Sequence, residues 1–116
     1  MGYPLVHIVN STAFAGSGKV YYASAFCSND DYSVAANGGQ WTASGRGVCL
    51  VTEVSATLYV NGTPVNASSY TSSGTSYSQF AIIQTSPTTF AVTRVTTLVD
   101  DIDVGELEPA PTEAQK

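Results

Sequence analysis

The chain has 116 residues, of which 28 are serine or threonine, whereas charged residues make up only 11%. This length corresponds to one domain of about 100–150 residues, and the scarcity of charged residues excludes a coiled coil or a Glu- and Lys-rich helical bundle. The net charge of −5 comes entirely from residues 100–116, so the neutral body cannot neutralise many phosphates, which excludes a basic nucleic-acid-binding protein.

Residues 1–99 lack helical periodicity and are rich in Val, Thr, Tyr and Ser, which is the composition of β-strands. Strands are predicted, in chain order, at Pro4–Val9, Lys19–Cys27, Tyr32–Ala36, Gln40–Ala43, Val48–Val60, Pro64–Tyr70, Tyr77–Thr85 and Thr89–Val99. The clearest of these is Val48–Val60, because its even positions are apolar apart from Thr52 and its odd positions turn polar after Val51. A period of two over this length predicts one long strand with one buried face.

Turn residues separate these segments. Asn61-Gly62 predicts a type I′ hairpin turn, since both central residues of that turn need a positive φ. Pro64 then predicts an edge strand or a strand start, because proline donates no hydrogen bond to a neighbouring strand. Ser86-Pro87-Thr88 fits a type I turn. Three further turns are predicted at Gly16–Gly18, Asn37–Gly39 and Gly45–Gly47.

About eight short strands with frequent turns predict an all-β fold, a single antiparallel β-sandwich over residues 3–99. Residues 100–116 are acidic and interrupted by prolines, so we expect them to form a disordered tail. The predicted core consists of Val20, Phe26, Val48, Leu50, Val54, Leu58, Phe80, Ile82, Phe90, Val92 and Val95.

The two cysteines, Cys27 and Cys49, leave two possibilities open. Both lie in apolar segments, so they could be buried free thiols, or they could form one disulfide between two strands. Such a bridge would stabilise the fold by roughly 3 kcal/mol.

The N-terminus shows no signal peptide, and no apolar run is long enough for a membrane-spanning helix. A cytoplasmic location and export by another route therefore both remain open.

Catalytic machinery is scarce, so we do not expect an enzyme. The single histidine, His7, lies on an apolar strand with Leu5 and Val9 on the same face. Ala15–Val20 looks like a phosphate loop, but valine follows Lys19 and the segment leads into a strand rather than a helix. The oxygens of Asn29–Asp31 could bind calcium, yet a polar turn explains these residues more simply. No metal or cofactor is predicted.

Two segments have the composition of recognition surfaces, in which aromatic rings provide contact area and hydroxyls provide hydrogen bonds. The first is the predicted loop from Tyr70 to Gln79, whose candidate ligand-binding residues are Tyr70, Ser72, Ser73, Thr75, Tyr77 and Gln79. The second comprises Asn29, Asp30, Asp31, Tyr32 and Trp41. These residues predict a non-catalytic, lectin-like binding module for a carbohydrate or a protein surface. The simpler interpretation is a flexible connection, with Trp41 in the core.

The alternative function is a structural or assembly protein that associates through exposed strand edges. The segment Phe80–Ile83 is uncharged and favours strand formation, so an exposed edge there could pair with another subunit.

Overall fold

The computed structural model of the protein describes residues 3–23, 26–45 and 47–95. The predicted acidic tail and the last four residues of the predicted strand Thr89–Val99 lie outside the described residues. No helix occurs in the described ranges, and thus none that could cross a membrane. The ten strands are β1 His7–Asn10, β2 Gly16–Tyr22, β3 Asp30–Val34, β4 Gly39–Thr42, β5 Val51–Val54, β6 Thr57–Val60, β7 Thr63–Asn66, β8 Tyr70–Thr75, β9 Gln79–Ser86 and β10 Thr89–Arg94.

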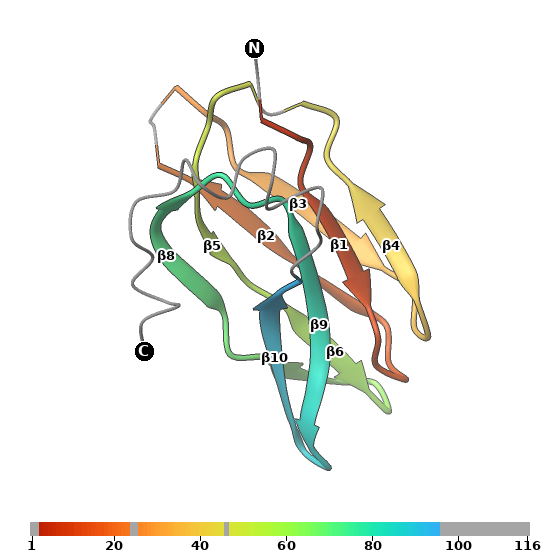
Figure 1. The fold of residues 1–116 in the computed structure, drawn as a ribbon. Helices are drawn as coiled ribbons and strands as arrows, with labels where there is room; N and C mark the ends of the chain where they lie inside the picture. Colours follow the sequence, from red (N-terminus) through yellow and green to blue (C-terminus); the bar gives the residue numbers. More distant parts are fainter. Residues whose placement is uncertain (1–2, 24–25, 46, 96–116) are drawn as a thin grey trace.

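The strands form two sheets that pack as a sandwich, which confirms the predicted fold class (Figure 1). One sheet has the order β10-β9-β1-β4, and the six-stranded sheet has the order β7-β6-β2-β5-β8, with β3 paired to β2. The pairing is antiparallel with one exception among the described strands, because β1 runs parallel to β9 with Ile8 opposite Phe80. The two sheets also meet at Ser68, whose N–H donates to Phe90 O over 2.9 Å.

The predicted strand Val48–Val60 is present as two strands that share one partner. β5 places Val54 opposite Val20, and β6 continues the same register with Leu58 opposite Gly16. The prediction is wrong before Val51, where the strand begins. A register irregularity at Thr52 puts one extra residue into β5, so the buried face shifts and Val51 points into the core.

The core lies between the sheets and contains seven of the predicted residues, Val20, Val54, Leu58, Phe80, Ile82, Phe90 and Val92. Leu50 and Val95 are only partly buried. The prediction is wrong for Phe26 and Val48, whose side chains are 99% and 68% exposed. Phe26 follows the end of β2 and Val48 precedes the start of β5, so neither residue lies in the strand that was expected to bury it. The core also includes residues that were not predicted, among them Val6, Ile8, Tyr32, Val34, Val51 and Tyr70.

The β6–β7 hairpin confirms the turn prediction, because Asn61 and Gly62 have φ values of 52° and 84°. Pro64 lies on β7, an edge strand of the six-stranded sheet, as expected. The prediction of a turn at Gly16–Gly18 is wrong, since these residues are the first part of β2.

Asn10 organises the connection from β1 to β2 and is fully buried. Its side-chain NH₂ donates to Phe14 O over 2.7 Å and to Ala35 O over 3.1 Å. Its side-chain oxygen accepts hydrogen bonds from the N–H and the hydroxyl of Thr12. One side chain thereby satisfies the buried polar groups of two separate loops.

Candidate functional site

The prediction of a loop from Tyr70 to Gln79 is wrong, because most of this segment belongs to strands. Residues Tyr70–Thr75 form β8 and pair with β5, with Tyr70 opposite Val54. Tyr70 and Thr75 are buried, and the Tyr70 ring packs against Phe80 with 5.0 Å between centroids. These two side chains face the core, where a soluble ligand does not reach them.

The other members of this segment are held by neighbouring groups. Ser72 Oγ donates to Val51 O over 2.9 Å and accepts the Gly74 N–H. The Tyr77 ring lies under the Arg94 guanidinium, 3.3 Å from its carbon. Gln79 is half-buried opposite His7, so Ser73 is the one exposed residue of the six predicted here.

The second candidate group is divided between the two faces of β3. Tyr32 is buried and its ring lies 5.6 Å from that of Trp41, which itself packs against the core. The position of Trp41 therefore agrees with the simpler interpretation, in which this residue packs in the core. Asp31 points to the opposite, solvent-exposed face, while Asn29 precedes the strand and is exposed. The described residues contain no group of three His, Cys, Asp or Glu side chains that could hold a metal ion.

A shallow groove of about 400 Å³ lies on the outer face of the six-stranded sheet, over β2, β3 and the β5–β6 connection. We call it the β2 groove. It is lined by Ser17, Gly18, Lys19, Tyr21, Asp31, Tyr32, Ser55 and Thr57. Of the residues predicted to bind a ligand, Asp31 and Tyr32 line it, and the others do not.

The charged pair of the β2 groove is Lys19 and Asp31, which are directly opposite each other on β2 and β3. Their side chains form an ion pair. The hydrogen bond to Asp31, and then its negative charge, raise the pKa of Lys19 above its ordinary value. Both side chains are well exposed, so the pair contributes little to stability but places a cation and a carboxylate side by side.

The groove lining also includes Tyr21 and several hydroxyl groups. Tyr21 lines the groove, and Tyr59, which is 44% exposed, shares a 3.0 Å hydrogen bond with Ser17 Oγ. Beside them, Thr57 Oγ1 donates to Asn66 Oδ1 over 2.9 Å. Period-two alternation explains this arrangement, because Ser17, Lys19 and Tyr21 share one face of β2. The same signal is present in the sequence, but it is hidden if Gly16–Gly18 is interpreted as a turn.

The floor of the β2 groove is held by Tyr32, whose phenol donates a hydrogen bond to Ser55 O. Gly18 lies against this contact, because a Cβ on it would be only 2.8 Å from the Tyr32 hydroxyl. Burial raises the pKa of the Tyr32 phenol, because ionisation would leave an anion without water. The phenol is therefore a neutral donor at physiological pH.

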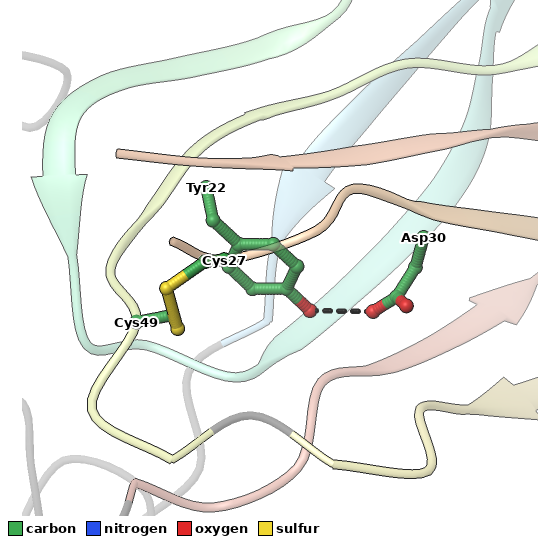
Figure 2. Close-up of a disulfide and its surroundings, with 4 residues drawn as sticks. All are labelled: Tyr22, Cys27, Asp30 and Cys49. Atoms are coloured by element: carbon green, nitrogen blue, oxygen red, sulfur yellow. Dashed lines mark hydrogen bonds between the residues drawn. A yellow bond between two sulfur atoms is a disulfide. The ribbon is translucent and has the colours of Figure 1, made fainter. Parts of the chain in front are cut away.

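Cys27 and Cys49 form a disulfide, which decides between the two possibilities that the sequence leaves open. Figure 2 shows Tyr22 beside this bridge, with its hydroxyl pointing to Asp30 and donating a hydrogen bond to Oδ2 over 2.7 Å. A second pocket of about 230 Å³ lies here, which we call the disulfide pocket. It is lined by Tyr22, Cys27, Ser28, Asp30, Ser44, Gly45 and Cys49.

His7, the remaining candidate for a catalytic role, lies on β1 in the four-stranded sheet. Its Nδ1 is 2.8 Å from Thr42 Oγ1, with which it forms a hydrogen bond. This partner belongs to the neighbouring strand, so the bond ties β1 to β4.

No protein-family model, curated protein or solved structure matches this chain.

Proposed function

We propose that the protein is a non-catalytic binding module that recognises carbohydrate through the β2 groove. The observation that carries this proposal is the composition of one exposed groove, whose lining combines an ion pair with tyrosines and hydroxyls. Sugar hydroxyls accept and donate hydrogen bonds, so Lys19 and Asp31 together match both roles. Tyr21 lines the groove and Tyr59 bonds to the lining residue Ser17, so their rings can offer apolar faces for the C–H surface of a sugar.

Within residues 3–23, 26–45 and 47–95, the candidate nucleophiles and bases do not come together, which favours a binding role. Both cysteines are bonded to each other, so neither offers the thiolate that a cysteine nucleophile requires. His7 is on the four-stranded sheet, whereas the carboxylates Asp31 and Glu53 belong to the six-stranded one. Asp31 raises the pKa of Lys19 further from neutral pH, whereas a general acid or base needs a pKa near the operating pH.

Association through strand edges is less well supported, because Phe80–Ile83 is not an edge. These residues belong to β9, which pairs with β10 on one side and β1 on the other. The free edge at β3 carries Asp30 and Asp31, and the edge strand β7 carries Pro64. Charges and prolines at edges oppose the addition of a further strand.

The test is a glycan array with the labelled protein, together with Tyr21→Ala and Tyr59→Ala. Thr88→Ala, an exposed change in the β9–β10 turn, is the control variant. We expect a set of bound glycans whose binding falls about tenfold in either tyrosine variant, equivalent to 1.4 kcal/mol, and is retained in the control.

A blank array with folded protein would contradict the carbohydrate proposal. In that case, an affinity capture that depends on Tyr21 and Tyr59 would instead indicate a protein ligand at the same groove. Glycan binding that is unchanged in both tyrosine variants would show that the protein binds sugars elsewhere.

A further inference from the structure

The disulfide pocket is a second site, separate from the β2 groove. It lies between the β2–β3 and β4–β5 connections, and the bridge from Cys27 to Cys49 forms part of its wall. Its volume of about 230 Å³ is smaller than that of sites for drug-sized ligands, which occupy roughly 300–1,000 Å³. The size therefore suits a small molecule or a single side chain.

Asp30 is the one charged side chain among the described residues that line this pocket. Within the described ranges it has no cationic partner, because the ion pair of this strand is made by Asp31 with Lys19. The Tyr22 hydroxyl donates to one of its oxygens, so the carboxylate is held in place from one side (Figure 2). A carboxylate has about four acceptor positions, which leaves capacity for a further donor.

The rest of the lining matches a particular donor. The hydroxyls of Ser28 and Ser44 add two oxygen acceptors to the carboxylate of Asp30. An alkylammonium group carries one positive charge and three N–H donors, so it matches this set in both charge and number. Gly45 adds no side chain, and a Cβ there would meet open space, so nothing at this position closes the pocket.

Two exposed apolar residues are next in sequence to the cysteines that line the pocket. Phe26 and Val48 directly precede the bridged cysteines and are two of the most exposed large hydrophobic residues of the described chain. The disulfide holds their two backbone segments together, with 6.2 Å between the Cα atoms of the cysteines. Exposed apolar residues on the two segments that the bridge joins to a charged pocket favour a ligand that combines a charge with a hydrocarbon stem.

From these observations we infer that the disulfide pocket binds an aliphatic ammonium group, with Asp30 as its counter-ion and Phe26 and Val48 against its alkyl stem. The group can belong to a free small amine or to the lysine side chain of a partner. The inference does not depend on the carbohydrate proposal, because the two sites share no lining residue.

The experiment is an NMR titration of the ¹⁵N-labelled protein, with its disulfide intact, at neutral pH and constant ionic strength. The probe is n-butylammonium chloride, and n-butanol and methylammonium chloride are the comparison compounds. A capped tripeptide with one central lysine tests the second source of the same group. We expect saturable shifts of the Ser28, Ser44 and Gly45 backbone amides, with tighter binding of n-butylammonium than of methylammonium and no response to n-butanol.

The matched variants are Asp30→Asn and Asp31→Asn, which remove the same charge from neighbouring residues. Asparagine at position 30 keeps an oxygen for the Tyr22 hydroxyl, so the pocket should remain folded. We expect Asp30→Asn to weaken n-butylammonium binding about fivefold, equivalent to 1 kcal/mol, and Asp31→Asn to leave it unchanged. A titration without saturable shifts, an equal response to n-butanol, or equal losses in both variants would overturn the inference.

Discussion

The carbonyl oxygen of Ser55 lies against Gly18 so closely that a Cβ on residue 18 would be only 2.0 Å from it. The same Cβ would be 2.8 Å from the Tyr32 hydroxyl, which bonds to that carbonyl. Real Cβ atoms do not come this near to backbone atoms, so β2 carries glycine here despite the low strand propensity of that residue. Glycine at position 18 therefore allows β2 to lie this close to Ser55.

Gly18→Ala should destabilise the fold by about 2 kcal/mol or more, because the contact atom is backbone and the strands must separate to accept a methyl group. Gly45→Ala is the matched control, since a Cβ at position 45 meets open space. Urea unfolding of both variants measures the difference. Equal stability of the two variants would contradict the close contact between Gly18 and Ser55.

Asn10→Ala should cost about 3 kcal/mol or more of unfolding free energy. The change leaves the buried Thr12 N–H and two loop carbonyls without the partner they have in the native protein, and each unsatisfied buried group costs roughly 1–3 kcal/mol. Asn66→Ala is the comparison, because Asn66 is exposed and its side chain bonds to Thr57, also at the surface. We expect the Asn66 variant to stay within about 1 kcal/mol of the native protein. A similar loss in both variants would show that the Asn10 network is not a stabilising unit.

The strand pattern of the sequence predicts the fold class because alternation requires only that one face of each strand be buried. The prediction of buried positions is wrong where an irregularity in strand pairing interrupts the alternation. The extra residue at Thr52 moves Val51 into the core, and no local residue type marks such a bulge in advance. The prediction for Phe26 and Val48 is wrong for another reason, since both residues lie beyond the ends of β2 and β5, where alternation no longer applies.

The candidate site was harder to predict than the fold, because hydroxyl-rich segments have two structural uses. In β8, Ser72 bonds to the backbone of the neighbouring strand, so a serine-rich sequence is as compatible with a buried strand as with a recognition loop. Closeness in sequence places Asp31 and Tyr32 in one predicted ligand patch, but neighbours on a strand face opposite ways. Only the pairing of β2 with β3 shows that Asp31 belongs with Lys19.

Removing the disulfide, by reduction or by the double change Cys27→Ser and Cys49→Ser, should lower the unfolding free energy by about 3 kcal/mol. The bridge closes a loop with a sequence separation of 22 residues, which limits the freedom of the unfolded chain. Urea unfolding with and without reductant measures this loss, and the double variant should be insensitive to reductant. An oxidised protein no more stable than the double variant would contradict the prediction.

The buried phenol of Tyr32 should make the fold sensitive to alkaline pH. Burial raises the pKa of this phenol in the folded state above the ordinary tyrosine value of about 10. Below pH 10 the phenol is protonated in both the folded and unfolded states, so the stability is fully present. Above pH 10 only the unfolded state releases the proton, and the unfolding free energy should fall by up to about 1.4 kcal/mol per pH unit.

Tyr32→Phe should remove this part of the alkaline loss, while costing about 1 kcal/mol at neutral pH because Ser55 O loses its phenol partner. Tyr59→Phe is the matched control, since it removes a phenol from the exposed face. Unfolding free energies measured from pH 7 to pH 12 should therefore fall less steeply for the Tyr32 variant than for the native protein and the control. Parallel curves for all three proteins would show that the Tyr32 phenol ionises as readily in the folded protein as in the unfolded chain.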